Sequence, residues 1–254
     1  MSNPFASPAM AAGYAADRPP MHARVLEHVR LELAARLPVE RALDVGCGAG
    51  LSTRALQHLA RCCVGLDPVP AMAAAGPLLA PAARFVVGAA EHLPCASASF
   101  DLVTAAGSLN FTDLDPALDE LARVVRPGGM LVVYDWATAG ECADDPALAT
   151  WFATFTARHP RPPSEAVALD PQTLARRATA FTLATATTFA WPLAMSMEAY
   201  ARYMLTETNV AAAVRGGAAL DDIRAWCHAT LADVFAGGPR EVLFRGYLAY
   251  LRRH

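Results

Sequence analysis

The chain has 254 residues, of which 54% are hydrophobic and 18% are charged, a composition typical of a globular protein with one sizeable core. Its formal net charge of −3 excludes a strong global attraction to nucleic acid or to an anionic membrane. The sequence contains no lysine, which excludes Schiff-base chemistry, and no apolar run of the roughly 18 residues that a transmembrane helix needs.

The first half of the chain predicts an alternating α/β arrangement. Residues 1–24 are rich in Ala, Pro and Ser and are expected to form an arm or lid. Apolar residues then recur at helical spacing over 21–37, and Pro38 ends this helix. Strands are predicted at 41–45, 62–66, 84–87, 100–105 and 130–134, and helices at 51–59, 70–79 and 115–125. Such alternation is typical of parallel βαβ units.

The pattern changes after Trp136. Helices are predicted at 146–158, 171–180, 196–206 and 221–236, around a strand at about 182–190, and a last strand follows at 241–251. We therefore expect a single α/β domain over 1–254 with a seven-stranded, mostly parallel sheet. Its cofactor-binding core would be 40–136, and 137–180 and 192–239 would form a cap.

The cysteines and the N-terminal segment bear on the compartment. The six cysteines form no C-x-x-C pair and no regular spacing, so neither a disulfide framework nor a metal site is predicted. The first 16 residues lack the basic and apolar regions of a secretory signal. The cytoplasm is the expected location.

A glycine-rich turn follows the first strand, in the sequence LDVGCGAG at 43–50. Its spacing is G-x-G-x-G, and Leu51 stands where a dinucleotide-binding loop would have its last glycine. Asp44 precedes the loop, where it would repel a pyrophosphate and attract a cationic amino group. A second acid, Asp67, ends the next strand, where a carboxylate can accept both hydroxyls of a ribose.

LDVGCGAG, followed by GLDP, resembles the class I S-adenosylmethionine-dependent methyltransferases of the type 11 family. GAAEHLP at 88–94 is similar to the family's adenine-contacting segment, FDLVT at 100–104 to its fourth strand, and LARVVRPGG at 121–129 to its next helix and turn. The resemblance covers about 40–136. It implies a Rossmann-like fold, S-adenosyl-L-methionine as cofactor, and methyl transfer to an O, N or C atom of a small-molecule acceptor.

The resemblance also implies roles for individual residues. The backbone of the loop would face the methionyl and ribose groups, Asp44 the methionine amino end, and Asp67 the ribose hydroxyls. Ala90 would offer its N–H to the adenine. The full set of expected cofactor-binding residues comprises Tyr14, Arg18, Asp44, Gly46, Cys47, Gly48, Gly50, Asp67, Pro68, Met72, Ala90, Glu91, Ala105 and Ala106.

Two positions depart from the family's pattern. Ala89 stands where an acid usually accepts the exocyclic amine of adenine, and Glu91 could take over that task. Asn110 stands where many relatives have histidine after the fourth strand. An amide can orient an acceptor but cannot take its proton.

The remaining candidates have competing structural interpretations. Tyr14 and Arg18 belong to the arm, which folds over the cofactor in relatives, and a guanidinium there can pair with the methionine carboxylate. His22 is a candidate general base, or else a surface or capping histidine. Tyr200 and Tyr203 could stack on an acceptor, or pack in a core. His22 and Asn110 are thus the catalytic candidates.

Three other functions compete with that of a small-molecule methyltransferase. A nucleic-acid methyltransferase is opposed by the negative charge and by AGSLN at 106–110, which replaces the N/D-P-P-Y/F motif. An NAD-dependent oxidoreductase is opposed by the glycine spacing. A catalytically silent cofactor-binding protein remains open. The sequence indicates neither the acceptor nor the oligomeric state.

Overall fold

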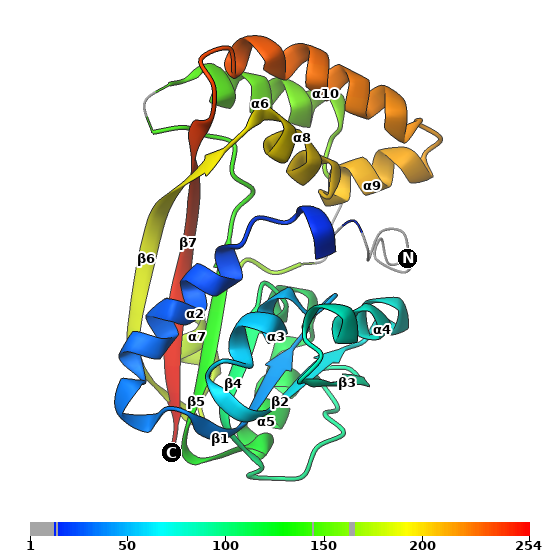
Figure 1. Ribbon diagram of the computed structural model, residues 1–254. Coiled ribbons are helices and arrows are strands. Elements are labelled where there is room, and N and C mark those ends of the chain that lie inside the picture. The colour runs from blue at the N-terminus through cyan, green and yellow to red at the C-terminus, as the bar shows by residue number, and fades with distance from the viewer. Residues whose placement is uncertain (1–12, 14, 144, 163–165) are drawn as a thin grey trace.

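The computed structural model describes residues 13, 15–143, 145–162 and 166–254. Its strands form one seven-stranded sheet in the order β3-β2-β1-β4-β5-β7-β6 (Figure 1). Five neighbouring strands run parallel: β3 (Arg84–Val87), β2 (Ala60–Asp67), β1 (Val39–Val45), β4 (Phe100–Ala106) and β5 (Val125–Trp136). β7 (Arg240–Arg253) runs antiparallel to β5 and to β6 (Phe181–Met195). This topology confirms the predicted fold class.

Helices cover both faces of the sheet. On one face lie α2 (Met21–Glu32) and α3 (Leu51–Leu56), whose buried Val25, Leu26 and Leu56 pack with β4 and β5. On the other lie α5 (Leu114–Val124) and α7 (Pro171–Arg177), which share a second apolar cluster with Val103 and Leu131. α4 (Pro70–Leu79) contacts β2 and β3. The central parallel strands β1 and β4 are therefore buried on both faces along most of their length, which explains their apolar sequences, whereas β3 at the side of the sheet is largely exposed.

A group of helices lies beyond the carboxyl end of β5 (Figure 1), and we call it the cap. It comprises α6 (Ala147–Arg158), α8 (Met197–Leu205), α9 (Thr208–Arg215) and α10 (Leu220–Val234). The buried Trp151, Phe155 and Tyr200 belong to the same apolar cluster as α2 and β5. The cap and the α2 face of the sheet thus share one continuous core.

Two segments differ from the predicted elements because their pairing lies far away in the sequence. β5 begins at Val125 rather than at residue 130, since Val125 pairs with Phe100 before an irregularity in the register. Residues 126–129, which precede the predicted strand, therefore lie inside β5. β6 extends from Phe181 to Met195, beyond the predicted 182–190, because its pairing with β7 continues along its whole length.

The predicted cap boundaries were partly wrong. The segment 171–180 was assigned to the cap, but Leu174 of α7 is fully buried in the cluster formed with α5 and the sheet. In the other predicted cap segment, α9 follows α8 as a separate helix that was not anticipated. At the N-terminal side, α2 begins at Met21, inside the 1–24 segment predicted as an arm.

Candidate functional site

The glycine-rich turn lies at the carboxyl end of β1, and the surroundings of its glycines differ. Gly46 packs against Ser108, so a Cβ at position 46 would overlap the Ser108 Cβ. Gly48 has φ +54, and a Cβ built there would meet no other atom of the described residues within 4 Å. The Cys47 side chain is buried, and burial raises the pKa of its thiol. Gly48 is thus the point at which the loop presents its backbone to open space.

Asp67 joins the end of β2 to this loop. One carboxylate oxygen accepts a hydrogen bond from Gly48 N–H at 2.8 Å, and the other accepts from Val69 N–H at 2.9 Å. Burial raises its pKa, which the two backbone hydrogen bonds oppose. Each carboxylate oxygen retains capacity for a further donor. The geometry is therefore compatible with the expected contact to ribose hydroxyls.

Asp44 is held by the hydroxyl groups of three other residues. It is fully buried, and it accepts hydrogen bonds from the hydroxyls of Ser52 at 2.6 Å, Thr53 at 2.7 Å and Thr104 at 2.9 Å. These partners lie on α3 and β4, on either side of the glycine turn. Burial raises the Asp44 pKa. Asp44 therefore fixes the base of the turn, and its expected contact with a methionine amino group stays a prediction.

The residues expected near adenine lie around the loop and β2. Met72 of α4 is buried and packs with Ala49 and Ala15. Pro68 is exposed and Ala90 is buried. Glu91 accepts a hydrogen bond from Asp113 N–H at 2.9 Å, ahead of α5. Met72 thus joins the loop to the arm, whereas a carboxylate oxygen of Glu91 already has a partner within the chain.

The ends of β4 and β5 bring together two polar side chains, those of Asn110 and Asp135, of which only Asn110 was predicted from the sequence. Ala105 is buried at the end of β4 beside Val45, and Ala106 is half-buried. Asn110 donates a hydrogen bond to the Asp135 carboxylate at 3.0 Å, and Trp136 N–H donates to the other oxygen at 2.8 Å.

Burial raises the pKa of Asp135. Among the described residues, no basic side chain forms an ion pair with this carboxylate. Asp135, like Asp67, is an acid near the carboxyl end of a parallel strand, where such sheets bind ligands. Its place in the sequence was therefore a signal that could have identified it.

The arm residues meet the cap. Tyr14 lies outside the described residues. Arg18 forms an ion pair with Glu207 at 3.1 Å, and its guanidinium lies 5.4 Å from the centre of the Tyr203 ring. Glu207 also accepts a hydrogen bond from Thr138 at 2.7 Å. One partner of Arg18 is therefore a carboxylate of the cap, and no local pattern in the sequence points to it.

His22 is half-buried at the start of α2. Its Nδ1 lies 3.0 Å from the Tyr134 hydroxyl, and its ring lies 4.9 Å from that of Trp136. Burial, with a contribution from the charge of Arg18, lowers its pKa from 6.5 to about 3. A base that weak takes up a proton poorly near neutral pH. His22 thus packs around the end of β5, and its role as a general base stays a prediction.

The two cap tyrosines are packing residues, contrary to the suggestion that they stack on an acceptor. Tyr200 and Tyr203 are both fully buried. The Tyr200 hydroxyl donates to the carbonyl of Ala139 at 2.8 Å, and Ala139 N–H donates to the Tyr203 hydroxyl at 3.4 Å. Both rings therefore fix the cap to the segment that follows β5.

The residues that the structure describes include no group of three or more His, Cys, Asp or Glu that could hold a metal ion. Nor do they include a helix with the length and apolar composition required to cross a membrane.

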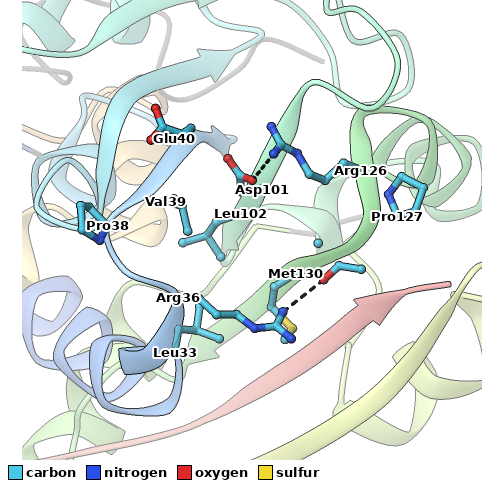
Figure 2. A pocket seen from close by; sticks show the side chains of 12 residues that line it. Leu33, Arg36, Pro38, Val39, Glu40, Asp101, Leu102, Arg126, Pro127 and Met130 are labelled. Carbon is cyan, nitrogen blue, oxygen red and sulfur yellow. Dashed lines mark hydrogen bonds and ion pairs between the residues drawn. The ribbon is translucent and has the colours of Figure 1, made fainter.

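Figure 2 shows a pocket of about 320 Å³ at the opposite edge of the sheet, by the amino ends of β1 and β4. Its arginines have partners within the chain, since Arg126 pairs with Asp101 at 2.6 Å and Arg36 donates to Gly128 O at 3.2 Å. Parallel α/β sheets bind ligands at the carboxyl ends of their strands. The candidate site is therefore the edge formed by the glycine turn, Asp67 and the end of β4.

Known sequences resemble this chain. Residues 43–133 match a family described as a methyltransferase domain. A demethylmenaquinone methyltransferase of Beutenbergia cavernae is 33% identical over 150 residues, which cover 59% of this chain and 61% of the relative. A protein of the same name from Mycolicibacterium paratuberculosis is 42% identical over 105 residues, 40% of this chain and 44% of the relative. The chain thus matches less than two thirds of the length of these curated relatives.

Solved structures share the fold. A candidate type II methyltransferase from Anaeromyxobacter dehalogenans has a TM-score of 0.65 and 24% identity, covering 89% of this chain and 94% of that one. Geranyl diphosphate C-methyltransferase from Streptomyces coelicolor, solved with S-adenosyl-L-homocysteine, has a TM-score of 0.51 and 15% identity, covering 91% and 78%. At these identities the likeness concerns the fold.

Proposed function

We propose that the chain transfers a methyl group from S-adenosylmethionine to a small-molecule acceptor, a proposal supported by the match of residues 43–133 to a family described as a methyltransferase domain. The observation that carries the proposal is the open backbone of Gly48, held by the carboxylate of Asp67 at the carboxyl edge of the sheet. The curated relatives that bear a methyltransferase name support it.

The residues at this edge suit the proposed cofactor. S-adenosylmethionine, when bound, supplies a methyl group activated by a positively charged sulfur. Gly48 would admit the nucleoside close to the backbone, and Asp67 would accept the ribose hydroxyls. Met72 would contact the adenine, because it packs beside the loop. The chain's own task is to align donor and acceptor and to exclude water.

The acceptor would lie beyond the ends of β4 and β5, where Asn110 holds Asp135. A half-buried carboxylate that pairs with an amide rather than a cation can accept a hydrogen bond from a hydroxyl or amino group. We therefore assign Asp135 to the acceptor side of the site and Asn110 to its positioning. The net charge of −3 disfavours a nucleic-acid acceptor.

We place the activity in the cytoplasm, with neither nucleic acid nor membrane as a partner. All six cysteines are free, which suits a reducing compartment. The segment 106–110 at the end of β4 lacks the aromatic motif expected of a base-modifying enzyme.

Calorimetry tests the cofactor part of the proposal. The purified protein should bind S-adenosylmethionine and S-adenosylhomocysteine and should not bind NAD. Micromolar binding of NAD with no binding of either methyl-donor ligand would contradict it.

A screen with labelled S-adenosylmethionine tests the reaction. It should include small hydroxyl, amino and quinol acceptors, the last because the relatives are named for demethylmenaquinone. Asp135→Ala should abolish transfer to the acceptor found while leaving calorimetric cofactor binding unchanged. Tight cofactor binding without transfer to any acceptor class would favour the catalytically silent alternative.

A further inference from the structure

The two outer strands of the sheet differ greatly in length and composition. β3 has four residues, begins with Arg84 and ends the sheet on one side. β6 has fifteen residues, FTLATATTFAWPLAM, and none of them is charged. Outer strands are usually short, charged or covered, because their free backbone groups can pair with another chain. β6 has none of these protections along its centre.

The centre of β6 is open on both faces. Residues 184–188 are consecutively exposed. Figure 1 shows β6 as the outermost strand, and among the described residues no strand pairs with its outer side. A register irregularity occurs between Leu183 and Thr185, but the pairing with β7 is regular from Thr185 to Met195. The regular part thus presents a free edge before Pro192, whereas Pro192 itself, with no N–H, closes it on that side.

Contacts around β7 show which residues of β6 direct their backbone N–H and C=O groups outward, away from β7. Pro192 pairs with Leu243, yet Leu243 N–H donates to Glu141 O at 2.8 Å, away from β6. The Pro192 carbonyl accepts from Arg24 at 2.7 Å, on the outer side of β6. Proline also lacks the N–H that a ladder position would require.

Ala190, two residues before Pro192, directs its backbone groups to the same side. Ala190 pairs with Arg245, whose carbonyl accepts from Ala137 N–H at 3.0 Å on the far side of β7. In an antiparallel pair, every second residue directs both backbone groups away from its partner strand. Ala186, Thr188 and Ala190 therefore present N–H and C=O groups outward.

From this edge we infer that the chain forms a symmetric dimer in which β6 pairs antiparallel with β6 of a second copy. Thr188 lies opposite the partner subunit's Thr188, on the two-fold axis, and Ala186 lies opposite the partner's Ala190. This register uses the outward groups of all three residues. It joins the two sheets into one continuous sheet.

A second copy fits this edge better than an unrelated strand. An interface around a two-fold axis must be complementary to itself, so any charge on the strand would meet its own copy. β6 has no charge, and its central residues are small or β-branched. Threonine pairs across neighbouring strands are favourable.

Sedimentation velocity on the full chain tests the dimer. The wild-type protein should be a dimer that dissociates on dilution. Thr188→Lys places two ammonium groups on residues whose Cα atoms lie about 5.5 Å apart, so it should weaken the dimer at least about tenfold. Thr188→Ser should dimerise normally, as should Ala74→Lys, which adds the same charge at an exposed position on α4.

Charge reversal distinguishes the proposed axis from a general effect of charge. Thr188→Glu alone should also be monomeric, but an equimolar mixture with Thr188→Lys should form a heterodimer. A monomeric wild type would overturn the proposal, because it would leave β6 to another kind of partner. A dimer that Thr188→Lys leaves intact would also overturn it.

Hydrogen exchange gives a second measurement that needs no variant. Raising the concentration of wild-type protein should slow amide exchange at 186, 188 and 190, the outward positions. Exchange in β3, the other outer strand, should not change. Equal exchange of β6 at all concentrations would contradict pairing through this strand.

Discussion

The cofactor half of the molecule and the cap are built in different ways. Around the glycine turn, particular residue types are required: Gly48 has a positive φ, and Asp67 holds its N–H. In the cap, aromatic residues such as Trp151 and Tyr200 fill a core, and their spacing is that of any buried helix face. A site that depends on backbone geometry can be recognised in a sequence, whereas a surface that depends on packing cannot. This explains why the cofactor could be proposed and the acceptor could not.

The largest expected effect tests the cofactor half directly. Gly48→Val should weaken S-adenosylhomocysteine binding by about 1,000-fold, or about 4 kcal/mol, because the side chain would occupy the ligand's space. The left-handed conformation should cost stability of only about 1 to 2 kcal/mol. Calorimetry and thermal unfolding measure the two effects.

Gly128→Val is the matched control. Gly128 also has a positive φ and open space around it, but it lies by the amino ends of the strands. It should lose similar stability and retain full affinity. Equal affinity in both variants would show that the ligand does not approach Gly48.

A smaller effect is expected where the arm meets the cap. Arg18→Ala leaves the nearly buried Glu207 without its cation, which should lower the free energy of unfolding by about 2 to 3 kcal/mol in urea titrations. Adding Glu207→Gln should restore part of the loss, because the uncompensated charge is then removed. Arg177→Ala, at the exposed pair with Asp115, should cost less than about 1 kcal/mol. Equal losses for the two arginines would contradict a buried connection between arm and cap.

Asp67→Ala should weaken cofactor binding by about 10- to 150-fold, since a hydrogen bond to a charged group contributes about 1.5 to 3 kcal/mol. Asp67→Asn should lose less, because an amide oxygen still accepts. Asp101→Ala is the control, since Asp101 also holds a backbone N–H, that of Arg41, but at the opposite edge. A cofactor analogue without ribose hydroxyls should bind the alanine variant with little further loss. Losses that simply add would remove Asp67 from the ribose site.

The smallest effect concerns pH and His22. Because the folded-state pKa is lowered from 6.5 to about 3, the unfolded chain binds one more proton throughout that window. Stability should therefore fall as the pH decreases below 6.5, by about 1 kcal/mol between pH 7.5 and 5.5. His22→Gln should lose this component, so the difference between variant and wild type isolates it in urea titrations. An identical pH dependence would show that His22 is not kept neutral by the fold.

The sequence alone predicted the positions of the first five strands along the chain and the loop between β1 and α3, because apolar periodicity and glycine spacing are local signals. It did not predict the start of β5 or the length of β6, since both depend on partner strands distant in the chain. The three hydroxyl partners of Asp44 were not predicted, because they become its neighbours only in the fold. The ion pair of Glu207 could not be predicted from the sequence, because its partner Arg18 lies 189 positions away.

The hydrogen bond from the Tyr200 hydroxyl to the Ala139 carbonyl has a consequence for engineering the protein. The acceptor is a main-chain atom, so the cap recognises the course of the connecting segment rather than a particular side chain. A segment from a related chain that replaces residues 141–239, and so brings its own cap helices together with its own α7 and β6, would therefore dock on this sheet if it retained a tyrosine at the place of Tyr200. Chimaeras built on that junction would combine one cofactor half with acceptor specificities from several donors.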